Sequence, residues 1–149
     1  MSWSLDRRAE QNHPELLDVR NREHLWVTGR TLHRILDGHL HDDEQVHELL
    51  MGAVGDMRAV LAVTDTRAIL AAEPRGSAAA HCAELPLAEV TSVEWTRHGP
   101  TGCLVLRTGN ACHVLKHVEL RHGPEVAERV RQRWLAVRTA VETKEPALA

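Results

Sequence analysis

The densest group of potential metal ligands in this chain lies between residues 33 and 47. The run His39-Leu40-His41-Asp42-Asp43-Glu44 follows His33 and precedes His47. In an extended segment, His39 and His41 point to the same side, where they would share an ion with a carboxylate. Alternatively, these side chains are solvated where a helix meets a strand, a place that mildly favours histidine. We keep a metalloenzyme using His39, His41 and His47 as an alternative, and expect no cofactor.

A second cluster of potentially reactive groups is Cys103, Cys112 and His113. The spacing matches neither a zinc knuckle nor a redox pair, and the 3 cysteines of the chain give no disulfide framework. Free cysteines that pack as small hydrophobes explain them better. The sequence also has no Gly-x-Ser-x-Gly elbow and no phosphate-binding glycine-rich loop. We therefore predict that the protein is not an enzyme.

Composition argues against nucleic acid as a partner. The formal net charge is −3 with histidine neutral, and the chain has 4 Trp but no Phe or Tyr to stack on bases. Arginines do recur in the last helix, but acidic residues are interleaved with them, so the helix is mixed rather than basic. These residues are Arg129, Arg131, Arg133 and Arg138 with Glu125, Glu128 and Glu142.

Length and hydropathy indicate one compact domain with an appendage. The chain has 149 residues, of which 43% are hydrophobic and 26% charged, and both shares are ordinary for a globular protein. No apolar run approaches the roughly 20 residues that span a bilayer. The first residues, Met1-Ser2-Trp3-Ser4-Leu5-Asp6-Arg7, lack the apolar core of a signal peptide. We expect a cytoplasmic protein without a transmembrane segment.

The pattern of apolar residues changes near Asp42. Residues 1–41 have helical spacings, for example at Leu25, Leu32, Ile35 and Leu36, and predict an N-terminal helical extension. After it come short apolar runs bounded by turn residues, which are typical of strands. The expected strands are Gln45–Val54, Arg58–Thr64, Arg67–Glu73, Ala80–Leu87, Val90–Arg97, Cys103–Thr108 and Ala111–Lys116.

A C-terminal helix is expected to begin at Pro124, since proline is favoured in the first turn. Its apolar residues are spaced four, four, three and four apart and form one stripe, which needs an apolar surface to lie on. They are Val126, Val130, Trp134, Val137 and Val141. Seven antiparallel strands followed by an amphipathic helix predict a bent sheet with the helix laid across one end.

Two central strands are apolar on both faces. Residues 60–63 and 68–72 are consecutive apolar runs, whereas a strand with one solvated face would alternate. One face points at the core of the domain. The other must meet the N-terminal helices or a second subunit.

Three stretches resemble the bacterial PH-like domains of the YokE-like kind, which share the shape of PH and GRAM domains. Glu44-Gln45-Val46 resembles the entry to the first strand, residues 61–70 resemble the hairpin with a Thr-Asp-x-Arg turn, and residues 84–93 resemble the passage from the fourth strand to the fifth. The resemblance covers about Asp42 to Val141. It implies a partly open seven-stranded barrel that is capped by a helix and lacks catalytic machinery.

The resemblance also suggests where a ligand would bind. In the wider PH group, ligands usually meet the loops that follow strands one, three and six. The polar residues that this sequence offers there are Arg58, Arg75 and Asn110. A phosphate cradle needs several converging donors, and the first hairpin has one Arg and one Asp, which argues against an inositol phosphate.

The sequence as a whole predicts a mainly β, α+β protein. It divides into an N-terminal extension (1–41), a PH-like domain (42–142) and a tail (143–149). The expected function is a non-enzymatic binding or assembly module. Homo-oligomer formation is the first expectation, because both strand faces are apolar and the extension offers a segment to dock or exchange. A peripheral role at anionic lipid is the alternative, and the protein or lipid ligand is not identified by the sequence.

Overall fold

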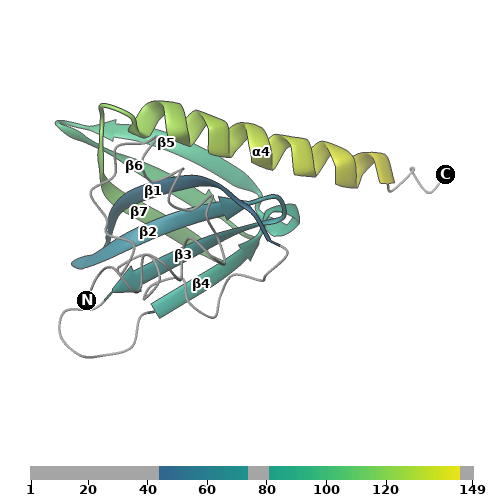
Figure 1. Cartoon of the computed structure of the whole chain (residues 1–149), viewed down its shortest axis with the longest axis horizontal. Helices are drawn as coiled ribbons and strands as arrows, with labels where there is room; N and C mark the ends of the chain where they lie inside the picture. The colour runs from purple at the N-terminus through teal and green to yellow at the C-terminus, as the bar shows by residue number, and fades with distance from the viewer. Residues whose placement is uncertain (1–43, 74–80, 145–149) are drawn as a thin grey trace.

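The computed structural model describes residues 44–73 and 81–144 (Figure 1). Seven strands are followed by one long helix, with a single turn of 3-10 helix between the fourth and fifth strands. The elements are β1 (Val46–Val54), β2 (Met57–Thr64), β3 (Arg67–Glu73), β4 (His81–Pro86), η1 (Leu87–Glu89), β5 (Ser92–His98), β6 (Thr101–Arg107), β7 (Cys112–Glu119) and α4 (Gly123–Lys144).

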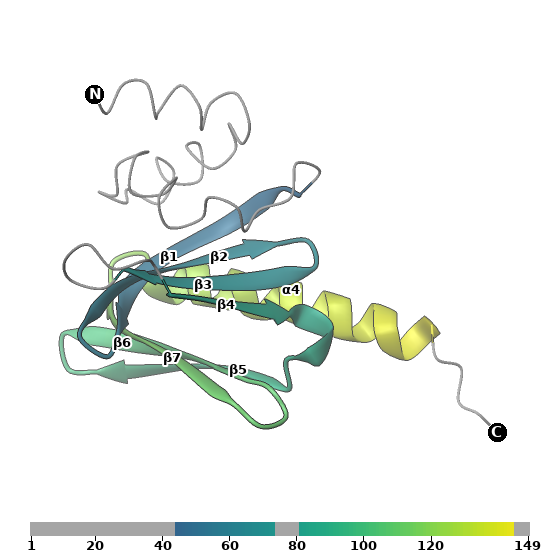
Figure 2. The same cartoon turned by 90° about the horizontal axis from the view of Figure 1, so that it is seen from below.

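The strands form one antiparallel sheet in the order β4-β3-β2-β1-β7-β6-β5. The sheet consists of two half-sheets, β1–β4 and β5–β7, which form the two layers of the domain (Figure 2). One residue pair, Ala53 with Lys116, joins them. A Cβ on Gly52 would lie 2.4 Å from the backbone oxygen of Lys116, so only glycine permits this close approach. The fold is the mainly β, α+β arrangement with a C-terminal helix that the sequence predicts.

The inner faces of both half-sheets and one side of α4 enclose the main core. Leucine and valine dominate this core, and Trp134 is the large aromatic side chain buried in it. The Trp134 indole N–H donates to the carbonyl of Val90 at 2.8 Å, which fixes α4 to the segment before β5. A buried bond of this kind contributes about 1 kcal/mol.

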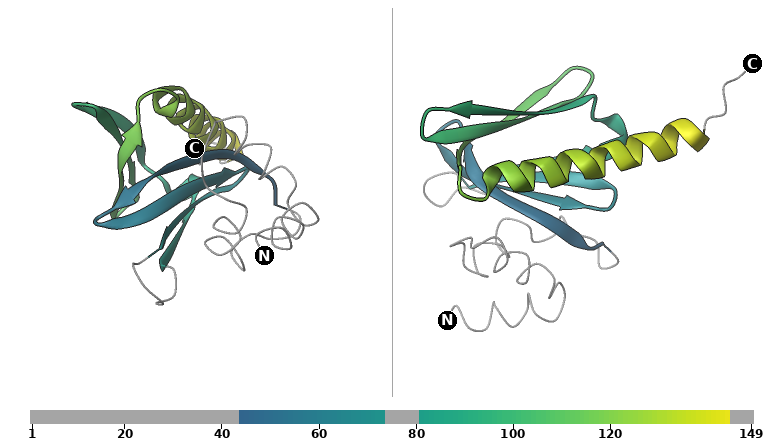
Figure 3. Two further views of the ribbon diagram at one scale, coloured as in Figure 1. Left: turned by 60° about the vertical axis from the view of Figure 1, so that its left-hand side comes forward. Right: turned by 90° about the horizontal axis from the view of Figure 1, so that it is seen from above.

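The apolar stripe of α4 lies on the sheet for only part of its length. Val126 and Val130 are buried, Val137 is half-buried, and Val141 is 37% exposed. The helix continues past the strands (Figure 3). The stripe predicted from the sequence therefore covers the open end of the sheet with its first four turns, and the last apolar position lies beyond the core.

The strands lie close to their predicted positions, with differences at two connections. The expected break at residues 98–102 is a two-residue turn in which Gly99 has a φ of 58°, so β6 begins at Thr101. Leu87 and Val90, expected at strand ends, are instead the first residue of η1 and the residue directly after it, and η1 turns the chain from one half-sheet to the other. The N-terminal extension predicted for residues 1–41 lies outside the described residues.

Trp95 supplies a specific test of the packing between β5, β6 and α4. Its ring lies directly over Gly102, where a Cβ would approach the ring to less than contact distance. We predict that Gly102→Ala lowers the free energy of unfolding by about 1–3 kcal/mol, because the ring must leave its position. Chemical denaturation with an unchanged m-value measures this loss.

Gly109→Ala is the matched control. An added Cβ there has no atom within 4 Å, and the residue has no left-handed backbone. This variant should be as stable as the parent or slightly more stable. Equal stability of the two variants would contradict the packing of Trp95 on Gly102.

Candidate functional site

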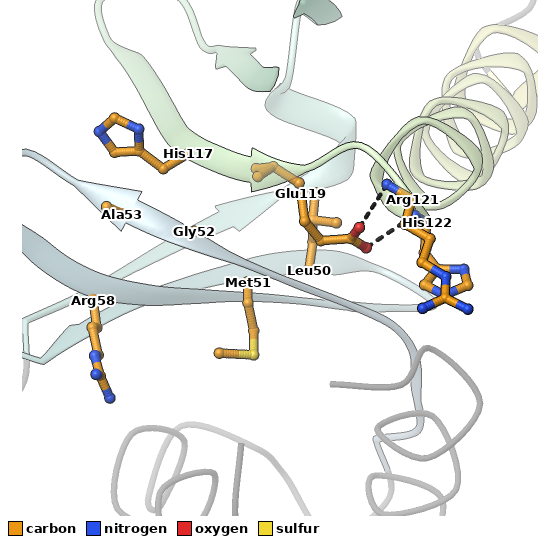
Figure 4. A pocket seen from close by; sticks show the side chains of 10 residues that line it. Leu50, Met51, Gly52, Ala53, Arg58, His117, Glu119, Arg121 and His122 are labelled. Atoms are coloured by element: carbon orange, nitrogen blue, oxygen red, sulfur yellow. Dashed lines mark hydrogen bonds between the residues drawn. The ribbon is translucent and has the colours of Figure 1, made fainter. Parts of the chain in front are cut away.

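A hollow of about 360 Å³ lies where β1 and the end of β7 separate (Figure 4). Polar side chains of β2, of β7 and of the turn before α4 line it. Its lining comes from β1, the start of β2, the end of β7 and the turn that leads into α4. The lining residues are Leu50, Met51, Gly52, Ala53, Arg58, His117, Val118, Glu119, Arg121 and His122.

The hollow exists because β7 leaves β1 directly after their paired residues. His117 has a φ of 57°, in the left-handed region that is uncommon for residues other than glycine. This conformation turns the strand away from β1 immediately after Lys116. Residues 50–52 of β1 and residues 118–122 consequently form two sides of an opening instead of a continuous ladder.

Glu119 fixes the turn between β7 and α4. Its two carboxylate oxygens accept the backbone N–H groups of Arg121 at 2.6 Å and of His122 at 2.9 Å. The carbonyl of His122 then accepts the N–H of Val126 and starts the helix. The acidic group of the lining is thus occupied by backbone donors, and the turn presents the side chains of Arg121 and His122 at the hollow.

The side chains around the hollow are of two kinds: Arg58, Arg121, the histidines and Glu119 are polar, and the remaining lining residues are apolar or glycine. Arg58, Met51, Arg121 and His122 extend to the same side of β1, whereas His117 points to the other side (Figure 4). The lining contains no hydroxyl and no thiol. Its arginine and histidine side chains are of the types that donate hydrogen bonds to anions.

Two further arginines hold α4 on the sheet. Glu48 of β1 is 2% exposed, and its carboxylate accepts from Nε of Arg129 at 3.0 Å and from Nε of Arg133 at 3.4 Å. A buried carboxylate without such donors would be costly. These two arginines therefore serve the packing of α4. Arg131 lies near Glu128 and Arg138 lies over the Trp134 ring, so the arginines of α4 are engaged within the domain.

An ion-pair network fixes the start of β1 to the hairpin of β2 and β3. Arg67 donates from Nε and from a terminal nitrogen to the two oxygens of Glu44, both at 2.6 Å, and lies 3.0 Å from Glu84. The hydroxyl of Thr64 also donates to Glu44. The hydrogen bond that Arg67 donates to Glu44 outweighs the effect of burial and raises the pKa of Arg67, which keeps the guanidinium charged.

The histidines proposed as metal ligands are only partly described. His47 bonds through Nε2 to the carboxylate of Asp65. His39 and His41 lie outside the described residues, and so do Asp42 and Asp43. Among residues 44–73 and 81–144, no three His, Cys, Asp or Glu side chains are grouped as metal ligands. The proposed metal cluster therefore stays a prediction.

Of the three polar residues predicted to bind a ligand, the structure describes two, and these two do not line the same hollow. Arg58 lines the hollow. Asn110 is exposed in the turn between β6 and β7 and does not line it. Arg75 lies outside the described residues.

The three cysteines are free thiols, and each lies on a different strand. Cys103 is half-buried on β6, and Cys112 is exposed at the start of β7. Cys82 is half-buried on β4, where burial and then the charge of Glu84 raise the pKa of its thiol. The burial expected for Cys103 and Cys112 is therefore partial for Cys103 and wrong for Cys112.

Comparison with known proteins supports the fold. No family model and no curated protein matches the chain. Among solved structures, it is similar to the hSac2 domain from the human phosphoinositide phosphatase Sac2, with a TM-score of 0.51 and 17% sequence identity. The match covers 87% of this chain and 84% of that one. The likeness and the strand order agree with a PH-like fold, which the sequence predicted.

The described helices include none that is long and apolar enough to cross a membrane.

The Arg67 network generates a prediction about stability. Arg67→Lys keeps the charge but loses the forked pair of bonds to Glu44, and its side chain is only 11% exposed. We expect a loss of about 1–2 kcal/mol in the free energy of unfolding. Urea denaturation measures it.

Arg107→Lys is the control, because Arg107 pairs with Glu94 at 3.7 Å and both side chains are more than half exposed. This change should stay within about 0.5 kcal/mol of the parent. An equal loss of unfolding free energy in the two variants would show that the paired hydrogen bonds from Arg67 to Glu44 do not stabilise the fold.

Proposed function

We propose that this protein is a non-catalytic binding and assembly module that self-associates. We also propose that it belongs with the bacterial PH-like domains that its sequence resembles, and that it acts in the cytoplasm. The observation that carries the proposal is a second apolar cluster on the outer face of β1–β3.

The outer cluster lies opposite the main core. Its six buried residues are at most 2% exposed, and Met51 and Cys82 pack against them. They are Val46 and Leu49 of β1, Val60 and Ala62 of β2, and Ile69 and Ala71 of β3. All of these residues belong to the half-sheet itself, while α4 packs on β1, η1, β5 and β6 around the main core. Within the described part of the chain, no second layer accounts for the burial.

An apolar outer face is unusual for an antiparallel sheet at a protein surface. Such sheets normally have one face in the core and one in water, with alternating apolar and polar residues. Here β2 and β3 place apolar residues on both faces. A face of this kind favours a permanent packing partner over solvent.

The partner that the chain itself offers is the segment before Glu44. It joins β1 directly, it is 43 residues long, and its predicted helical stripe includes Leu25, Leu32, Ile35 and Leu36. Docking in the same chain would close the domain. Docking on the outer cluster of a second copy would exchange the segment and produce a dimer, which is a common low-cost route to self-association.

A peripheral role at an anionic membrane is the second candidate function. Two exposed arginines, Arg58 and Arg121, at one hollow favour it. The similar solved domain comes from a phosphoinositide phosphatase, which is compatible with a lipid-related role but, at 17% identity, transfers no ligand. Metal-dependent catalysis through His39, His41 and His47 is the third, and metal analysis of the purified protein tests it.

Light scattering after size exclusion tests self-association. The full chain should elute as a defined oligomer, and a chain that starts at Asp42 should be monomeric or aggregate, because its outer cluster loses the exchanged segment. The double variant Leu32→Glu and Ile35→Glu should behave like the shortened chain. Exchange of Leu5 for Glu, outside the predicted stripe, is the control. A full chain that is monomeric at every concentration would refute self-association.

A further inference from the structure

We propose that the free edge of β5 pairs with β5 of a second copy, as two antiparallel strands related by a two-fold axis at Thr96. The partner is this chain itself, and the pairing would join two sheets edge to edge. This contact is separate from the exchange of the N-terminal segment, because it uses β5 alone and the outer cluster lies on the other half-sheet.

β5 is an edge strand with an open side. It forms one margin of the sheet, next to α4 (Figure 1), and pairs with β6 alone. In residues 44–73 and 81–144, the backbone hydrogen bonds outside the ladders involve no residue of β5. The exposed residues of the strand are Glu94, Thr96, Arg97 and His98. The N–H and C=O groups along this side are therefore open to a further strand.

The two edges of the sheet differ in how they resist such pairing. Natural edge strands are protected by proline, by lysine, by bulges or by being very short. β4 ends at Pro86, which has no N–H to donate, and its Glu84 is engaged with Arg67. β5 has no proline and no lysine, and its ladder with β6 runs without a register shift. β5 is therefore the edge that accepts a partner.

The side chains of β5 select one register for this pairing. In an antiparallel pair, residues that lie directly opposite point to the same face and interact. An axis at Thr96 sets Thr96 opposite its own copy and Glu94 opposite His98 of the second copy. An axis at Glu94 would oppose two carboxylates, and one at Trp95 would set Glu94 opposite a threonine. Of these three registers, the one at Thr96 gives Glu94 a partner that can carry positive charge, and the two-fold axis forms this pair twice.

Both groups of this pair are available. The Oε2 atom of Glu94 lies 3.7 Å from Nε of Arg107, which is too long for a hydrogen bond, and both side chains are more than half exposed. His98 forms no side-chain hydrogen bond or ion pair with a residue that the structure describes.

The contact is small, so we expect a dissociation constant of about 10⁻⁴ to 10⁻³ M. Light scattering after dilution on a column would not detect an association this weak, and that experiment therefore reports segment exchange.

Sedimentation velocity of the full chain at protein concentrations from about 10⁻⁵ to 10⁻³ M tests the pairing. The average mass should rise with concentration above that of the species present at the lowest concentration. Glu94→Lys removes the acceptor and His98→Glu opposes two carboxylates, so each should abolish the rise, and the double variant should restore it. Glu125→Lys, the same change at an exposed residue of α4, is the control and should keep the rise. Melting curves check that every variant folds.

A disulfide across the two-fold axis tests the register. Thr96→Cys, made in a Cys112→Ser background because Cys112 is exposed, should form a covalent dimer under mild oxidation. The reason is that the two Cβ atoms would lie about 5 Å apart. Thr91→Cys in the same background is the control, because Thr91 is also exposed but precedes β5, and it should not form this dimer.

The two proposed contacts fail separately. Glu94→Lys should leave the oligomer made by segment exchange intact, and Leu32→Glu with Ile35→Glu should leave the covalent dimer of Thr96→Cys intact. The pairing of β5 is overturned if the mass does not rise with concentration or if the rise persists in Glu94→Lys. It is also overturned if Thr91→Cys forms a covalent dimer as readily as Thr96→Cys.

Discussion

The constraint on which the rest of this structure depends is that β2 and β3 are apolar on both faces. Leu61 and Leu70 point into the main core, while Val60 and Ile69 point the opposite way into the outer cluster. Burying both sets requires a layer on each side of the half-sheet. The inner layer is made by β5–β7 and α4. The need for an outer layer leads to the proposal that the N-terminal segment is a structural part of the domain and the means of its assembly.

The second constraint is the narrow junction between the half-sheets. Gly52 lets β7 approach β1, and the left-handed backbone of His117 turns β7 away at once. The opening that results is the hollow, so its position follows from how the sheet bends and not from a dedicated loop. Glu119 then sets the turn that presents Arg121 and His122. Fold and candidate binding site thus share the same few residues.

The sequence predicts the strands well because each is a short apolar run bounded by turn residues, as in Arg67–Glu73, which matches β3. The apolar stripe also predicts that residues after Pro124 form a helix. The stripe does not show where the helix leaves the sheet, because that point depends on the width of the sheet. Arg58 was identified because it adjoins a hairpin. Arg121 and His122 were not, because their placement depends on one unusual φ at His117. Contacts between distant residues, such as Glu48 with Arg129, also leave no local pattern.

The most direct test of the outer layer is a methyl NOE experiment on the full chain, with a second sample that mixes labelled and unlabelled copies. We expect NOEs from Ile69, Val60 and Leu49 to Leu32, Ile35 and Leu36. In the mixed sample, the same contacts should appear between labelled and unlabelled copies, which reports exchange of the segment. An outer cluster whose methyl groups contact only one another and water would show that the N-terminal segment does not cover it.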